Sequence, residues 1–310
     1  MHYFYCLSLC LAIVMSASGC VVETRVGDGS CGGCAADCDH DETNGCETDL
    51  STVENCGACR HACSAREICL AGTTCWNPDD ALIGAWTFEE ASGSAVSDVS
   101  LGALDGNVCS FQTDTAMCTD DGNGPIRGSG HNGRGLIFDG VDDGVFVPFS
   151  STLHPTFISM EAWINWSGNL ADWQQRVIEH TRAASSSTVS NYSMTITPEG
   201  GVQVEMRLHD VEGDGAVEKF ETRIVLNAFE WTHLIVTYDG QRIVVYKDGT
   251  KVDDHAVLGQ LLYPETTSSG LGIGNQTNRN RPFYGTLDDV RIYNRALTAI
   301  EVAARYNFTR

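Results

Sequence analysis

The chain has 310 residues, of which 42% are hydrophobic, so it is long enough for one large domain and a smaller unit. Its 41 acidic residues against 19 basic ones give a formal net charge of −22. This balance argues against a nucleic-acid partner, because phosphate contacts need clustered Lys and Arg. The same acidic surface attracts cations such as Ca²⁺, although solubility alone also explains the charge.

The N-terminus predicts export. An apolar run, YFYCLSLCLAIVM, is followed by the small residues of SASGC. The run is shorter than the roughly 20 apolar residues of a transmembrane helix, so residues 1–19 are interpreted as a secretory signal peptide. The tetrapeptide ASGC resembles a bacterial lipobox, which predicts lipidation of Cys20 and anchoring at the outer membrane or cell surface. Cleavage near Ser18 without a lipid is the alternative, and residues 20–30 are read as a linker.

Residues 31–75 form a cysteine-rich module with almost no large apolar residues, so covalent links must hold it together. Its two Cys-x2-Cys pairs, CGGC and CGAC, would indicate zinc in a cytosolic chain, but export favours disulfides, whose partners the sequence leaves open. The stretch DCDHDETNGCETDLSTVENCGACRHAC resembles the short modules of myxobacterial surface proteins. This resemblance implies an extracellular spacer or stalk, which a polar linker at 76–81 ends.

From Leu82 onward the sequence consists of short alternating segments. One face of the segment FISMEAWINW is apolar: Ile158, Met160, Ala162 and Ile164. Asp-Gly pairs at 239–240 and 248–249 indicate tight hairpins. No amphipathic helix longer than about two turns precedes Thr298, as judged by the 3.6-residue period. This pattern predicts an all-β, two-sheet antiparallel jelly-roll sandwich preceded by the small disulfide-rich module.

The end of the chain, GTLDDVRIYNRALTAIE, predicts a buried strand followed by a helix. The apolar strand positions are Leu287, Val290 and Ile292. Thr298 and Glu301 have the spacing of a capping box, in which each side chain binds the other residue's backbone N–H. We expect the strand to close a sheet and the helix to cover the edge of that sheet.

Several sequence motifs mark this region: AWTFEEASGSAVSDVSLGALDGNV, IFDGVDDGVFVPFS, FEWTHLIVTYDG and FYGTLDDVRIYNRALTAIEV. In sequence and in order they resemble the motifs of laminin G-like, concanavalin A-like lectin/glucanase jelly-roll domains, and the resemblance extends over residues 82–308. The resemblance implies secretion and a non-catalytic binding or adhesion role, with a polysaccharide, glycoprotein or matrix-like ligand as the partner. A polysaccharide-acting enzyme of unfamiliar type and a structural envelope component without a ligand are the alternatives.

Calcium is the cofactor that the resemblance implies. A jelly roll usually brings its first and last strands side by side, which would place Asp288 near Glu90 and Asp98. Ca²⁺ binds six to eight hard oxygens, so these three carboxylates are the predicted metal ligands. The alternative is that Asp288 only caps a turn. A second candidate cluster, for which simple hairpin turns are the alternative, is Asp139, Asp142 and Asp143.

Sugar rings stack on aromatic faces, so exposed aromatic residues at strand ends are candidate ligand-binding residues. The predicted ones are Trp166, Trp173 and Tyr284, with a buried core role as the alternative for each. Cys109 and Cys118 are close enough in sequence to form a local disulfide. No E-x-D-x-x-E strand, G-x-S-x-G elbow or H-E-x-x-H helix occurs, so no catalytic residue is expected.

Overall fold

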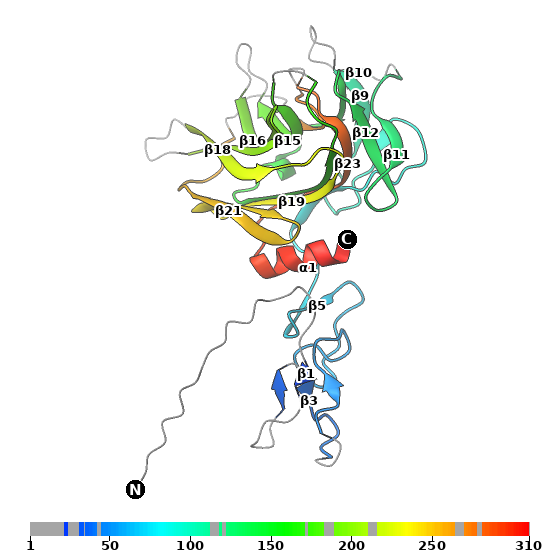
Figure 1. Ribbon diagram of the computed structural model, residues 1–310, viewed down its shortest axis with the longest axis vertical. Helices are drawn as coiled ribbons and strands as arrows, with labels where there is room; N and C mark the ends of the chain where they lie inside the picture. Colours follow the sequence, from blue (N-terminus) through cyan, green and yellow to red (C-terminus); the bar gives the residue numbers. More distant parts are fainter. Residues whose placement is uncertain are drawn as a thin grey trace. The chain divides into compact units, whose positions relative to one another are not determined.

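The computed structural model describes residues 22–23, 31–33, 35–41, 45–111, 118–119, 122–170, 173–182, 189–209, 216–263, 270–277 and 281–309. The chain forms two compact units, Met1–Pro78 and Asp79–Arg310 (Figure 1). Within the described ranges, no helix has the length and apolar character needed to span a membrane.

The first unit contains only short strand pairs among its described residues. The pairs are β1 (Val22–Glu23) with β2 (Gly32–Gly33), β3 (Ala35–Ala36) with β4 (Thr48–Asp49), and β5 (Ile68–Leu70) with β6 (Thr74–Trp76). Ladders of two or three residues bury too little apolar surface to be stable alone. Four disulfides stabilise the unit instead: Cys31–Cys46, Cys38–Cys59, Cys56–Cys69 and Cys63–Cys75.

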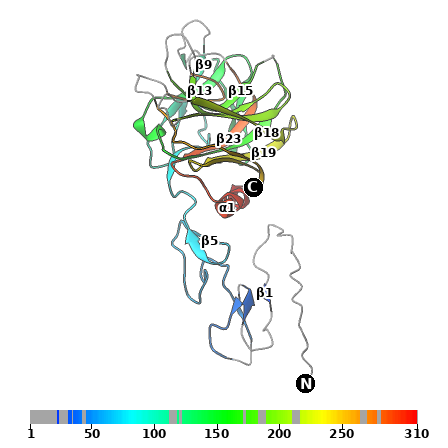
Figure 2. The ribbon, with the colours of Figure 1, turned by 90° about the vertical axis from the view of Figure 1, so that its left-hand side faces the viewer.

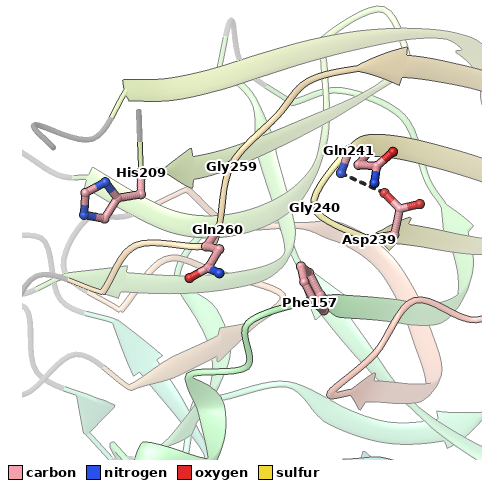
Figure 3. Close-up of a pocket in the computed structure, with 7 residues that line it drawn as sticks. All are labelled: Phe157, His209, Asp239, Gly240, Gln241, Gly259 and Gln260. Carbon is pink, nitrogen blue, oxygen red and sulfur yellow. Dashed lines mark hydrogen bonds between the residues drawn. The ribbon is translucent and has the colours of Figure 1, made fainter. Parts of the chain in front are cut away.

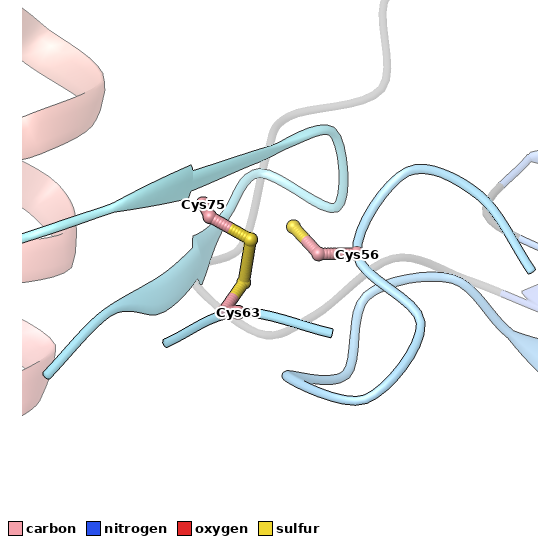
Figure 4. Close-up of side chains that lie close together, drawn as sticks. All are labelled: Cys56, Cys63 and Cys75. Carbon is pink, nitrogen blue, oxygen red and sulfur yellow. A yellow bond between two sulfur atoms is a disulfide. The ribbon is translucent and has the colours of Figure 1, made fainter. Parts of the chain in front are cut away.

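These bonds confirm the predicted disulfides for eight cysteines of the module, while Cys34 lies outside the described residues. The sulfur atoms of Cys56, Cys63 and Cys75 lie within 4.8 Å of one another, as they would in a metal site (Figure 4). All three are oxidised, however, because Cys63 is bonded to Cys75 and Cys56 to Cys69. Zinc needs thiolates, so the zinc interpretation is wrong for these cysteines.

The second unit is a sandwich of two antiparallel sheets (Figure 2). One sheet has nine described strands in the order β10-β9-β13-β22-β15-β16-β17-β18, with β8 also paired to β9. Its strands are β8 (Ala95–Val96), β9 (Gly106–Phe111), β10 (Cys118–Thr119), β13 (Asp143–Val147), β15 (Gln175–Arg182), β16 (Val189–Ile196), β17 (Gly201–Leu208), β18 (Ala216–Val225) and β22 (Leu271–Ile273). This architecture confirms the predicted all-β sandwich.

The other sheet has eight described strands in the order β11-β12-β23-β14-β19-β20-β21, with β7 also paired to β23. Its strands are β7 (Leu82–Trp86), β11 (Ile126–Ser129), β12 (Arg134–Asp139), β14 (Ile158–Trp166), β19 (Trp231–Tyr238), β20 (Arg242–Lys247), β21 (Thr250–Ala256) and β23 (Tyr284–Tyr293). A short 3-10 helix, Ser151–Leu153, precedes β14, and α1 (Ala299–Thr309) ends the unit.

The core lies between the two sheets and follows the alternation of the strands. On β14 the apolar positions Ile158, Met160, Ala162 and Ile164 are fully buried, as predicted. The facing sheet contributes apolar side chains from β16 and β17: Tyr192, Met194, Val202, Val204 and Met206. Because inward side chains are apolar, polar side chains of the same strands are left on the outer faces.

The first and last strands of the second unit are neighbours, as predicted. Trp86 of β7 faces Val290 of β23. The capping box is also confirmed, because Thr298 N donates to Glu301 Oε2 at 2.7 Å and Glu301 N donates to Thr298 Oγ1 at 3.3 Å. The helix begins where the sequence indicates, directly after Thr298.

The position of α1 differs from the expectation. The helix covers the outer face of the eight-stranded sheet rather than its edge (Figure 1). Trp163 Nε1 on β14 donates to Thr309 Oγ1 at 3.1 Å, and Val302 packs with Ile235 and Tyr293. The central strands carry large side chains on this face, and these side chains need a cover.

Candidate functional site

Two rows of polar side chains lie on the outer face of the nine-stranded sheet. In the first row Glu179 of β15 faces Ser193 of β16, Ser193 faces Glu205 of β17, and Glu205 faces Lys219 of β18. The second row crosses the same strands and consists of Arg176, Thr195, Gln203 and Glu221. We call these eight residues the polar grid. It exists because period-two alternation turns the intervening residues, such as Val204, toward the core.

Charges of opposite sign are neighbours in the grid, and Arg176 contacts two of its carboxylates. Its Nε lies 2.6 Å from Glu179 Oε2, and its Nη1 lies 3.9 Å from Glu205 Oε1. Lys219 Nζ lies 2.9 Å from the same oxygen of Glu205, and its side chain is 57% exposed. Burial raises the pKa of Glu179, against the lowering effect of Arg176. The grid is therefore a buried ion network that reaches solvent at the β18 edge.

Two buried polar atoms of the grid make no hydrogen bond or ion pair within the described part of the chain: Ser193 Oγ and Gln203 Oε1. Their residues are 0% and 2% exposed. Leaving such a group unpaired costs about 1–3 kcal/mol, so proteins rarely keep several together. The arrangement favours a ligand that both donates and accepts hydrogen bonds.

Gln276 and Asn275 connect the grid to the turn between β12 and β13. Gln276 Nε2 donates to Glu179 Oε1 at 2.8 Å. Asn275 Nδ2 donates to the main-chain oxygens of Asp142 and Asp143 at 3.3 and 3.0 Å. Both amide residues are buried, so the grid and this turn form one fixed surface.

The turn itself gathers three carboxylates. Oxygens of Asp139, Asp142 and Asp143 lie within 4.8 Å of one another. Asp143 is 3% exposed, its Oδ2 accepts from Asp139 N at 2.8 Å, and its Oδ1 makes no hydrogen bond with the described residues. Burial, together with the charges of Asp139 and Asp142, raises the pKa of Asp143 to about 7. Three carboxylates whose oxygens converge, one of which is buried and makes no hydrogen bond with the described residues, fit a divalent cation such as Ca²⁺.

The predicted metal ligands Glu90, Asp98 and Asp288 are not gathered in this way, since their carboxylates do not form a group within 4.8 Å. Glu90 Oε2 pairs with Arg127 Nη1 at 2.7 Å. Asp98 instead fixes the loop between β8 and β9, where it accepts from the backbone N–H groups of Ala85, Ser100 and Leu104.

Asp288 is used in a turn, which was the alternative interpretation. Its Oδ2 accepts from the backbone N–H groups of His131 and Asn132 at 2.9 and 3.0 Å. Burial raises its pKa to about 7. The structure therefore places Asp288 as a loop cap, and its carboxylate does not gather with those of Glu90 and Asp98.

One of the three predicted ligand-binding aromatics is corrected. Trp166 is 7% exposed and belongs to the core, because it lies two residues after the inward-facing Ile164 on β14 and therefore on the same face of the strand. Gly200 lies so close to its ring that an added Cβ would be 2.7 Å from Cζ3. Trp166 therefore has the buried role that was its alternative.

Trp173 and Tyr284 lie at the end of the sandwich that carries the acidic turn. Trp173 is 38% exposed, and the guanidinium of Arg281 lies 6.0 Å from its ring centroid. Tyr284 faces Asp139 in the register of β23 and β12. Gly140 packs against Tyr284, since an added Cβ there would lie 2.9 Å from the tyrosine Cβ. Tyr284 thus borders the turn, and Trp173 lies beside Arg281.

Two further predictions concern cysteines. Cys109 is disulfide-bonded. Its predicted partner Cys118 lies on β10, where the backbone faces Phe111, but the Cys118 side chain is outside the described residues. Cys20, the predicted lipidation site, is also outside them. Both the pairing and the lipidation remain predictions.

The sequence interpretation missed the polar grid. A signal existed in GVQVEMRL, where Gln203, Glu205 and Arg207 alternate with apolar residues. That pattern predicts one polar strand face, but it does not show that β15 and β16 add Glu179 and Ser193 to the same row.

The sequence profile of the concanavalin A-like lectin/glucanases superfamily matches residues 139–303. The match covers more than half of the 310 residues and includes the acidic turn and the grid, so the chain belongs to this superfamily. No curated protein matches the chain.

Solved structures share the fold at low sequence identity. Domain 4 of AbnA, a GH43 extracellular arabinanase from Geobacillus stearothermophilus in complex with arabinotriose, has 17% identity and a TM-score of 0.54, over 72% of this chain and 97% of that one. The binding domain of Paraclostridial Mosquitocidal Protein 1 has 15% identity and a TM-score of 0.54, over 75% and 53%. Trypanosoma rangeli sialidase in complex with sialic acid has 18% identity and a TM-score of 0.53, over 76% of this chain and only 34% of the sialidase.

Proposed function

We propose that the protein is a secreted, non-catalytic binding protein that recognises a polysaccharide, or the glycan of a glycoprotein, through the polar grid and the adjacent turn. The observation that carries this proposal is the presence of two buried polar atoms without a hydrogen bond to the described residues, Ser193 Oγ and Gln203 Oε1, beside the ion-paired Arg176. Sugar hydroxyls both donate and accept hydrogen bonds, so they complement such a mixed row. The arabinotriose bound by the similar AbnA domain supports a sugar as the ligand class.

Calcium is part of the proposal, at Asp139, Asp142 and Asp143 rather than at the carboxylates first predicted. The ion would offset most of the charge of the three carboxylates and bind Asp143 Oδ1, which is buried without a hydrogen bond to the described residues. Because Asn275 joins this turn to the grid, a bound ion would also hold the end of the binding surface in place.

The test is a glycan array that includes arabino-oligosaccharides and sialylated glycans, probed with the full chain with and without calcium. We expect the Gln203→Ala variant to lose at least tenfold in affinity for any hit, because it removes an unpaired acceptor from the grid. Asn227→Ala, on an exposed turn, is the matched amide control and should bind like the wild type. Equal binding by both variants would reject the grid as the site, and an array without hits would favour a structural envelope component.

A second candidate function is hydrolysis of a glycosidic bond. Glu179 and Glu205 lie in one row of the grid with a single strand between them, and burial raises the pKa of Glu179, as a general acid requires. A reducing-sugar assay with wild type and Glu179→Gln distinguishes hydrolysis from binding alone.

We also propose export and a lipid anchor on Cys20. The disulfides of the first unit require an oxidising compartment, which supports secretion. Intact mass of the mature protein decides the anchor: an acyl mass on the wild type that is absent from Cys20→Ala supports it. A mature wild-type chain that starts before Cys20 without added mass would contradict it.

A further inference from the structure

A pocket of about 380 Å³ lies at the end of the sandwich where β14 begins (Figure 3). Phe157 precedes β14, Asp239 and Gln241 belong to the turn between β19 and β20, and His209 and Gln260 follow β17 and β21. Trp166, nine positions further on, pairs with Gly285 beside Tyr284. A strand rises about 3.3 Å per residue, so the pocket is roughly 30 Å from the acidic turn and is a separate site.

The three segments around the pocket are fixed to one another by backbone hydrogen bonds. Gly259 N donates to Gly240 O at 3.1 Å, and His209 N donates to Gln260 O at 2.8 Å. Tyr238 OH, from the core, donates to Gly259 O at 2.8 Å. A cavity held in this way needs little ordering when a ligand binds, which removes a main cost of association.

Two glycines keep the pocket open. Gly240 has φ +88°, and a Cβ there would lie 2.6 Å from Phe157 Cε1. At Gly259 a Cβ would lie 2.8 Å from the main-chain oxygen of His209. Larger residues would therefore press on the walls, and the bare backbone leaves the Phe157 ring, which is 36% exposed, facing the space.

The side chains around the ring are polar and hydrogen-bonding. Figure 3 shows Phe157 between Gln260 and Asp239, with His209 beyond Gln260 and Gln241 beside Asp239. Asp239 Oδ1 accepts from the N–H groups of Gln241 and Arg242 at 2.9 and 2.8 Å, which fixes the carboxylate and leaves Oδ2 outside these bonds. Among the described residues that line the pocket none is Lys or Arg, which argues against an anionic ligand.

We propose that this pocket binds one neutral pyranose unit, independently of the polar grid. The ring of Phe157 provides the stacking face, and the amides of Gln241 and Gln260 offer donors and acceptors to neighbouring hydroxyls. Asp239 Oδ2 accepts from a further hydroxyl. A second sugar site roughly 30 Å from the first would allow one polysaccharide to be held at two points, with a gain in avidity.

The experiment is saturation-transfer NMR and titration of the full chain with methyl glycosides of glucose, galactose, mannose, N-acetylglucosamine and arabinose. We expect millimolar binding of at least one pyranoside by the wild type. Phe157→Ala should weaken this binding about tenfold or more. Aromatic stacking raises affinity by up to roughly tenfold, in addition to the contribution of the buried apolar area. Phe229→Ala, an exposed phenylalanine outside the pocket, is the matched control and should stay within twofold.

Two further variants distinguish loss of a pocket contact from poor folding and from an effect elsewhere on the surface. Gln260→Ala removes an amide without disturbing the ring, so it should weaken binding even if Phe157→Ala folds poorly. Asn227→Ala, on an exposed turn outside both the pocket and the grid, should leave monosaccharide binding unchanged. Absence of binding by the wild type at 20 mM, roughly the weakest affinity a stacked pyranose would show, would overturn the proposal. So would monosaccharide binding that Gln203→Ala abolishes and Gln260→Ala preserves, because that result would place the sugar at the grid. Absence of glycan binding at the grid would leave the pocket proposal intact.

Discussion

Arg305 of α1 donates from Nε to both carboxylate oxygens of Glu161 on β14, at 3.1 Å each, and so joins the C-terminal helix to the centre of the eight-stranded sheet. Glu161 is fully buried and also meets His233 Nε2 at 3.0 Å and the hydroxyl of Tyr293 at 2.8 Å. Burial alone opposes ionisation of Glu161, but Arg305, His233 and Arg291 outweigh it, and the pKa of Glu161 is lowered.

Removing the cation from this pair should strongly destabilise the second unit. Arg305→Met leaves Glu161 charged and buried without its main partner, and breaking a buried ion pair in this way costs about 3–5 kcal/mol. Urea unfolding followed by tryptophan fluorescence measures the loss. Arg242→Met, which breaks an exposed contact with Asp254, is the control and should cost less than about 1 kcal/mol. Equal losses in the two variants would show that the pair does not dock the helix.

The same carboxylate predicts an acid-sensitive fold. Because the folded pKa of Glu161 lies below its unfolded value of about 4.3, its stabilising effect is complete above that pH and is lost as the pH falls further. Melting temperatures measured between pH 6 and pH 2.5 should fall steeply below about pH 4.5 in the wild type. Glu161→Gln should be less stable at pH 6 and show a flatter curve. Parallel curves for the two proteins would contradict this assignment.

The raised pKa of Asp143 predicts that the stability of the fold changes with pH in the opposite direction. Its folded pKa of about 7 lies above the unfolded value, so in the absence of metal its ionisation destabilises the fold progressively as the pH rises from about 4 to 7. Asp143→Asn should therefore raise the melting temperature in EDTA at pH 8. Calcium should raise the melting temperature of the wild type and have little effect on this variant.

Asp288→Asn is the matched control for the calcium test, because the pKa of Asp288 is also raised to about 7 while the residue lies outside the acidic turn. It should change stability in EDTA and keep the full calcium-dependent increase. If calcium stabilises Asp143→Asn as much as the wild type, the ion does not bind at the turn.

The sequence predicted those parts of the fold that depend on neighbours along the chain. Alternation identified β14, and the spacing of Thr298 and Glu301 identified the start of α1. The same alternation was misleading on the other face of β14, where the charge of Glu161 suggests solvent but the side chain is buried and paired with Arg305 of α1. A sequence shows the polarity of a residue, and it does not show whether a distant helix supplies the ion-pair partner.

The candidate site could not be predicted in the same way, because its residues are brought together by strand register, which is a long-range property. The grid brings Glu179 and Glu205 into one row through two strand pairings, and bulges in the first pairing shift the alternation of β15. The acidic turn was visible as a motif because its three aspartates are adjacent in sequence. Its connection to the grid runs through Asn275 and Gln276, more than 130 residues away, and no local pattern indicates it.

The disulfides of the first unit should stabilise that unit alone. Each unit is compact by itself, and the second has its own hydrophobic core, so loss of one bond in the module should not weaken the sandwich. Replacing both Cys63 and Cys75 by Ser should cost the module about 2–5 kcal/mol, because its strand pairs bury little apolar surface. Hydrogen exchange should show lost protection in β5 and β6 and unchanged protection in β14 and β19. Faster exchange in β14 of this variant would mean that the module and the sandwich unfold as one cooperative unit.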